Sequence, residues 1–178
     1  MHSAGEEAPV SVGFSKYIKD SGLLKLLLKL ALIGLCLWLL LSFVGGVFRV
    51  SGNQMYPALR DGDLCVTFRL DEYRSKDVVV FRDDAGNARF ARIIARRGDT
   101  VGVDEIGLLV NGSHPMEEIF YPTDMSGTAP ELPVTLSDGQ VFVLNDFRSD
   151  SSDSRQFGLL STADLQGKVV LVLRLRGI

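Results

Sequence analysis

One long uncharged segment constrains this chain more than any other feature. From Leu30 to Phe48 the sequence contains no Asp, Glu, Lys or Arg, and leucine is its commonest residue. About 20 helical residues cross the hydrocarbon core of a bilayer. The segment extends back to Leu23 if Lys25 and Lys29 direct their amines toward the headgroups. We therefore expect one transmembrane anchor over residues 23–48, and the lack of a second such run excludes a polytopic transporter.

A cleaved secretory signal peptide is the alternative interpretation of this segment. It would have a shorter apolar core, of about 7–15 residues, and would end in a small-x-small motif. Here the segment ends in the bulky residues Val47 and Phe48, which favours an uncleaved anchor.

The lysines before the anchor indicate its orientation. By the positive-inside rule, the basic end of a membrane helix stays in the cytoplasm. We therefore expect residues 1–22 to form a cytoplasmic tail and residues 49–178 an extracellular domain at the cell membrane. The lysines in question are Lys16, Lys19, Lys25 and Lys29.

Composition limits the class of the remaining domain. The chain is 46% hydrophobic with a net charge of −3, which is too apolar and too weakly charged for intrinsic disorder. Two cysteines exclude a disulfide scaffold, and we expect Cys65 to be a small buried hydrophobe. The length leaves room for one domain of roughly 130 residues beside the anchor.

Short apolar runs separated by Gly, Asp and Asn predict that this domain is mainly β. Asn111-Gly112 is typical of a type I′ hairpin turn. The proline-rich segment 114–140 is expected to be an extended excursion between strands. Together the runs predict a small antiparallel barrel-like fold; the strands are expected at 64–68, 77–81, 90–95, 108–110, 141–144 and 169–175.

Four sequence blocks follow the anchor in a characteristic order: residues 51–59, 77–81, 91–99 and 145–155. The last block has the pattern Asp-x-Arg-x-x-Ser-x-Asp-Ser-Arg, which is rarely met by chance. In this order and spacing the blocks resemble the type I signal peptidases of bacteria, in their compact Gram-positive form. The resemblance covers about residues 23–167. It implies a single N-terminal transmembrane helix followed by a small signal-peptidase-type β-domain.

The resemblance also implies a serine nucleophile and a lysine general base, and neither is present. The position of the family's serine is occupied by Gln54, whose carboxamide cannot form an acyl-enzyme. The position of the family's lysine is occupied by Ala91, and the neighbouring Arg92 stays protonated. Ser51 and Lys76 do not have the family's spacing, and neither does His114 with any partner. On this interpretation the chain has no catalytic residue.

Two further groups of residues take their expected roles from the resemblance. A peptide-binding groove is expected, in which one exposed sheet edge pairs with an extended peptide through backbone hydrogen bonds. Its residues are expected to be Gln54, Met55, Tyr56, Pro57, Val79, Val80 and Phe81. A buried network of ion pairs and turns is expected to support the site, formed by Asp146, Arg148, Ser151, Asp153 and Arg155.

Three functional hypotheses follow. The first is that the chain is not an enzyme but a signal-peptidase-like accessory factor in sortase-dependent pilus assembly, with pilin subunits or the sortase as partners. The second is a type I signal peptidase that cleaves signal peptides from exported preproteins, either with an unrecognised nucleophile or as a trapped variant. The third is a tethered β-domain without a peptide ligand.

Several other chemistries find no support in the sequence. No Cys/His cluster has the spacing of a metal site, and no Gly-rich loop ends in Gly-Lys-Ser/Thr, so no cofactor is expected. The arginines between positions 89 and 97 lie in an acidic domain outside the cytoplasm. A nucleic-acid partner is therefore not expected, and headgroups or neighbouring carboxylates are better partners for these arginines: Arg89, Arg92, Arg96 and Arg97.

Overall fold

The computed structural model describes residues 22–116 and 122–174. It divides into two compact units, Met1–Leu40 and Leu41–Ile178. Within the described residues one helix is long and apolar enough to cross a membrane, over Gly22–Leu40. The expected tail, residues 1–22, lies almost entirely outside the described part of the chain.

Helix α1 spans Gly22–Val44 and is shorter than the expected span of 23–48. Its exposed leucines lie on all sides, as in a helix that faces lipid. The helix ends where two glycines, which have low helix propensity, follow one another. The next residues form strand β1, Gly45–Arg49, which pairs with β2, Leu64–Phe68.

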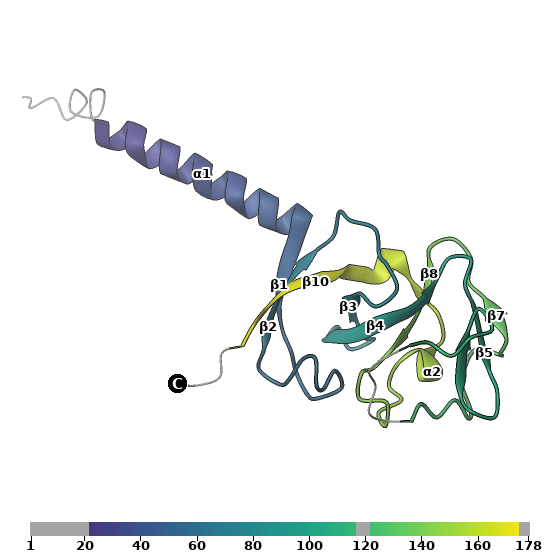
Figure 1. Ribbon diagram of the computed structural model, residues 1–178. Helices are drawn as coiled ribbons and strands as arrows, with labels where there is room; N and C mark the ends of the chain where they lie inside the picture. The colour runs from purple at the N-terminus through teal and green to yellow at the C-terminus, as the bar shows by residue number, and fades with distance from the viewer. Residues whose placement is uncertain (1–21, 117–121, 175–178) are drawn as a thin grey trace, which may run out of the picture. The chain divides into compact units, whose positions relative to one another are not determined.

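A seven-stranded antiparallel sheet forms the body of the second unit (Figure 1), in the order β1-β2-β10-β3-β4-β8-β9. Strands β3 and β4 are joined by a tight hairpin and lie near the middle of the sheet. The remaining strands of this sheet are β3 Val78–Arg82, β4 Ala88–Arg96, β8 Gln140–Leu144, β9 Leu160–Ser161 and β10 Leu165–Leu173.

A smaller sheet of three strands has the order β6-β5-β7, with β5 Thr100–Val103, β6 Leu108–Val110 and β7 Val134–Thr135. The turn after β6 has positive φ at both Asn111 (55°) and Gly112 (76°), as the hairpin prediction requires. Residues 114–140 are not only an excursion, because Met125 and Leu136 are buried in the core and Val134 pairs with β5.

The expectation of a mainly antiparallel β-domain after an apolar N-terminal helix is confirmed. Three apolar clusters form its core. One cluster contains Val50, Met55 and Phe90, and a second contains Val79 and Ala91, so the two faces of the β3–β4 hairpin are both buried over part of their length. Short elements complete the domain: helix α2, Ser154–Phe157, and a 3₁₀ turn, Thr162–Asp164.

Candidate active site

The loop between β1 and β2 carries the first candidate residues. Met55 is buried and anchors the loop in the apolar cluster beneath it. The amide of Gly52 donates to Asp61 Oδ1 at 2.8 Å, which closes the loop on itself. The carbonyl of Gln54 accepts a hydrogen bond of 2.9 Å from the amide of Phe147. The position of Gln54 is therefore fixed from two sides, by the core below and by the block 145–155 beside it.

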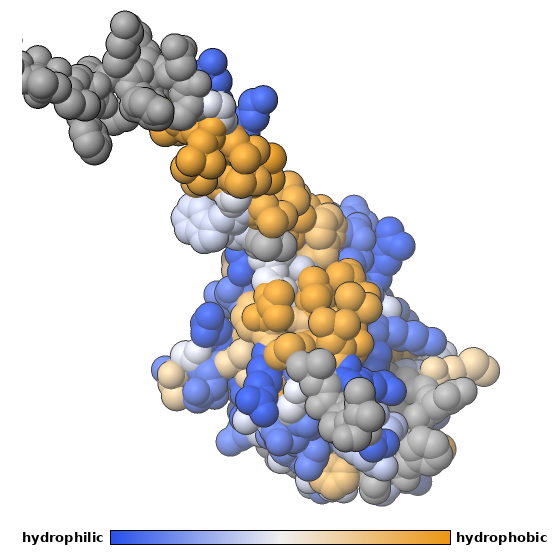
Figure 2. Space-filling view, turned by 90° about the vertical axis from the view of Figure 1, so that its left-hand side faces the viewer, coloured by the Kyte–Doolittle hydropathy of each residue, from blue (hydrophilic) through white to orange (hydrophobic). Residues whose placement is uncertain are grey.

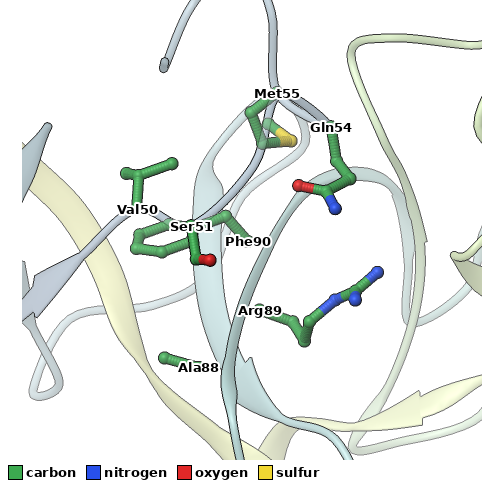
Figure 3. Close-up of a pocket in the computed structure, with 7 residues that line it drawn as sticks. All are labelled: Val50, Ser51, Gln54, Met55, Ala88, Arg89 and Phe90. Carbon is green, nitrogen blue, oxygen red and sulfur yellow. The ribbon is translucent and has the colours of Figure 1, made fainter. Parts of the chain in front are cut away.

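A narrow pocket lies between this loop and β4 (Figure 3). The cavity holds only about 10 Å³, so it admits a small side chain and no larger one without rearrangement. Ser51 is the residue among its lining that carries a hydroxyl group. The seven lining residues are Val50, Ser51, Gln54, Met55, Ala88, Arg89 and Phe90.

Strand β4 has an edge that is only partly used. On one side, residues 88–92 pair with β3. On the other side β4 pairs with β8 only over residues 92–96. In the described part of the chain, residues 88–91 therefore have no strand partner on that second side. This open edge forms one wall of the narrow pocket.

The direction in which the backbone groups of β4 point follows from the hydrogen bond that Ile93 makes to Asp77. The amide of Ile93 donates to the carbonyl of Asp77 at 2.9 Å, on the β3 side. Backbone groups alternate in direction along a strand. The peptide groups of Ala88 and Phe90 therefore point to the open edge, where an added strand would meet them.

The expected groove residues Val79, Val80 and Phe81 do not lie at an open sheet edge. These residues lie in β3, which pairs with β10 on one side and with β4 on the other, so no backbone group there is free to bind a peptide. Val79 and Val80 are also fully buried. Strand β4 has nine residues and outruns the five of β8, which leaves the edge at residues 88–91 open.

The remaining expected groove residues have different surroundings. Tyr56 and Pro57 are exposed, and Arg60 stacks over the Tyr56 ring at 5.1 Å. Ala91 is 1% exposed and faces the cluster of Val79 and Phe81, on the sheet face opposite to that of Phe90. Ala91 itself does not line the pocket that contains Gln54, although the preceding residue, Phe90, does.

The block 145–155 brings the expected supporting residues together below the loop. Asp153 and Arg155 form a bidentate ion pair, with distances of 2.9 Å from Nε to Oδ1 and 2.7 Å from Nη2 to Oδ2. Asp153 also caps α2 and accepts from the amide of Asn145 at 3.0 Å. Arg155 Nη1 donates to the carbonyl of Arg148 at 2.9 Å. Both charges are thus buried with several hydrogen bonds each.

A second ion pair ties this block to β4. Arg92 donates to both carboxylate oxygens of Asp146, at 2.7 Å from Nε and 2.5 Å from Nη2. Arg148 is buried and donates to Thr123 Oγ1 at 3.0 Å. Ser151 is exposed, and it joins the network only through its carbonyl, which accepts a hydrogen bond from the amide of Asp153.

Beneath the pocket, Cys65 is fully buried next to Met55 and Val50. Burial, and to a smaller extent the charge of Asp63, raises the pKa of the Cys65 thiol to about 11. The thiol is therefore neutral at physiological pH and serves as an apolar core residue.

The chain is similar in sequence to proteins of one known family. A family model described as "Signal peptidase, peptidase S26" matches residues 23–174. The chain belongs to this signal peptidase family. It is 31% identical over 154 residues to "Probable signal peptidase I-1" of Synechocystis sp., covering 78% of this chain and 76% of that protein. It is 28% identical over 153 residues to "Signal peptidase I" of Bacillus licheniformis, covering 78% and 82%.

Among solved structures, a signal peptidase I from Enterococcus faecalis V583 aligns with a TM-score of 0.48 at 24% identity. The alignment covers 56% of this chain and 98% of that structure.

Membership of the signal peptidase family corrects the first functional hypothesis. The relatives are named as signal peptidases, so the expectation that the chain is not an enzyme is overturned. No relative among these is named for pilus assembly, and the accessory role with pilin or sortase partners is not supported. The side chains at 54 and 91 are a carboxamide and a methyl group, so any cleavage reaction at this site would have to use other groups of the pocket.

Proposed function

We propose that the chain is a membrane-anchored signal peptidase that binds the signal peptides of exported preproteins beside β4 and cleaves them. The observation that carries the proposal is the open edge at residues 88–91 next to a pocket of about 10 Å³. An extended peptide can add to such an edge through backbone hydrogen bonds. The narrow pocket then restricts the side chain that enters it to a small one.

The proposal requires a nucleophile in this pocket, and Ser51 is the residue that supplies a hydroxyl among its lining. Ser51 is exposed and therefore accessible to a bound peptide. It lines the pocket together with Arg89 of β4 and with Gln54, the position that the resemblance assigns to the family's serine (Figure 3). The amide groups of Gln54 are suited to donate a hydrogen bond to a peptide carbonyl.

The lining of the pocket also predicts how fast this reaction is. Arg89 is the one titratable residue among the seven, and a guanidinium does not accept a proton. General base catalysis contributes typically about 10²–10⁴-fold to a rate. We therefore expect cleavage by this chain to be slower by about that factor than cleavage by a serine–lysine dyad.

A cleavage assay with three forms of the full chain in detergent tests the proposal. The natural chain should release the mature part of a purified preprotein slowly, and Ser51→Ala should abolish the release. The double variant Gln54→Ser/Ala91→Lys should cleave faster, because it places a serine and a lysine at the two positions that the resemblance assigns to the family's dyad. If the double variant cleaves while the natural chain matches the uncatalysed rate, the groove is intact and the proposed cleavage by the natural chain is wrong.

The membrane arrangement belongs to the same proposal. We infer a cytoplasmic tail at 1–22, an anchor at 23–48 and an extracellular domain at 49–178. Apolar side chains gather on one face of the β-domain (orange in Figure 2). Val47 and Leu171 are exposed and both pair with Val66 in neighbouring strands. Such a face suits a domain held at a lipid surface. Protease added outside intact cells should digest the domain; protection of the domain would contradict the orientation.

A further inference from the structure

Arg89 is a partly buried cation of β4 that has no carboxylate within ion-pair distance in the described part of the chain. Its Nη2 donates to Ser152 Oγ at 2.7 Å, and Ser152 in turn donates its hydroxyl proton to Asp150 at 2.5 Å. The serine therefore fixes the direction of the guanidinium and does not neutralise it. Arg92 of the same strand differs, because both carboxylate oxygens of Asp146 accept from it.

The narrow pocket brings this uncompensated charge to the candidate site. Arg89 lines the pocket together with Ser51 and Gln54 (Figure 3). One block of the chain holds two of the three residues in place. Phe147 donates its amide to the carbonyl of Gln54 at 2.9 Å, and Ser152 accepts from Arg89. The hydroxyl, the carboxamide and the guanidinium are therefore positioned around one small space.

The position of Arg89 within β4 shows how the charge of this site differs from that of a serine–lysine dyad. Side chains alternate along a strand, so Arg89 lies on the same face of β4 as Ala91, the position that the resemblance assigns to the family's lysine. A lysine amine can lose its proton when it is desolvated. A guanidinium stays charged and offers five N–H donors. The site thus has a permanent positive charge, and such a charge favours an anionic ligand.

We infer that Arg89 binds the C-terminal carboxylate of a cleaved peptide whose last residues lie along residues 88–91 of β4. Hydrolysis of the peptide bond attacked by Ser51 leaves a carboxylate on the released signal peptide and an ammonium group on the mature part. A carboxylate forms charge-assisted hydrogen bonds with a guanidinium, which are stronger than those of a neutral peptide carbonyl. The inference rests on the proposed peptide binding beside β4. It adds that the site retains its product more tightly than a peptide without this carboxylate.

Two forms of one labelled peptide test this inference with the full chain in detergent. The peptide has a polar flank and ends in Ala-Ser-Ala, either as the free acid or as the C-terminal amide. At pH 7 the acid is ionised, and fluorescence anisotropy gives both dissociation constants. The acid is expected to bind the natural chain about tenfold more tightly than the amide. In Arg89→Gln this preference should disappear while the affinity for the amide stays unchanged, which also shows that the variant is folded.

The matched control is Arg82→Gln, which removes one positive charge from the same β3–β4 hairpin. Arg82 is exposed, donates to the carbonyl of Gly86 at 2.7 Å and does not line the narrow pocket. This variant should keep the preference for the acid. Arg89→Lys, which retains the charge without the planar fork, should keep part of it.

The outcomes separate this inference from the proposed function. Equal affinities of the natural chain for the acid and the amide would overturn the inference and leave the proposed peptide binding intact; this comparison needs no variant. A preference that survives Arg89→Gln, or that Arg82→Gln abolishes equally, would overturn the assignment to Arg89. Saturable binding of neither peptide to the natural chain would overturn the proposed peptide binding as well.

Discussion

The block 145–155 and the pocket around Ser51 and Gln54 lie side by side but are built differently. In the block, Asp153 and Arg155 are buried charges whose carboxylate and guanidinium make several hydrogen bonds. In the pocket, Ser51 is exposed and Gln54 is held mainly through its backbone. A change in the block therefore has to alter folding, whereas a change of side chain in the pocket alters chemistry. Stability measurements on single variants can test this division.

The largest effect is expected for Asp153→Ala. Removing one partner of a buried ion pair leaves the other charge without compensation, which typically costs about 3–5 kcal/mol. The amide of Asn145 and the first turn of α2 also lose their acceptor. Denaturant titration followed by far-UV circular dichroism should show this loss in the free energy of unfolding.

The control for Asp153→Ala is Arg97→Ala, which breaks an ion pair with Asp138. The side chains of this pair are 73% and 71% exposed, and exposed pairs contribute about 0–1 kcal/mol. Similar losses for the two variants would show that burial does not distinguish the block from the surface.

Asp146→Ala is expected to have an intermediate effect. Its carboxylate accepts two hydrogen bonds from Arg92 at the border between the block and β4, where the pair is only partly exposed. Hydrogen bonds to charged groups contribute about 1.5–3 kcal/mol, so a loss of about 2 kcal/mol is expected in the same titration. A loss as large as that of Asp153→Ala would show that the partly exposed ion pair of Asp146 stabilises the fold as much as the buried pair does.

The sequence carries more information about the block than about the strand edges, and the reason is physical. The contacts of Asp153 with Arg155 and Asn145 join residues near one another in the chain, which a motif records directly. The groove depends on which strand edge stays unpaired, and this follows from the pairing of β3 with β10, a strand that lies more than 80 residues away in the chain. A run such as Val78–Phe81 is equally compatible with a central strand and an edge strand, so the sequence alone does not show that β3 is paired on both sides.

The core below the pocket gives a pH-dependent prediction. Because burial raises the pKa of Cys65 to about 11 from 9.0, the folded chain keeps this thiol protonated at a pH where the unfolded chain has lost the proton. Stability is therefore retained below pH 9 and falls as the pH rises from 9 to 11. Because of this group, the free energy of unfolding should fall by about 1 kcal/mol per pH unit in this range.

Urea titrations at pH 8, 9 and 10 would measure this slope, and Cys65→Ala is the control that should reduce it. An unchanged slope in Cys65→Ala would assign the alkaline loss of stability to other groups. Native Cys65 should also resist alkylation at pH 8 and react only after unfolding.

The smallest effect on stability is expected for Gln54→Ser, on the pocket side of the comparison. The hydrogen bond from Phe147 uses the carbonyl of residue 54 and persists in the variant, and the half-exposed side chain is not part of the apolar core. Substitutions at such positions usually change the free energy of unfolding by no more than about 0.5 kcal/mol. A loss above about 1 kcal/mol in the same titration would mean that Gln54 supports the fold as the block does. A small loss together with a changed cleavage rate is the result that separates the two regions, since Gln54→Ser alters the groups that face a bound peptide and leaves the supporting contacts in place.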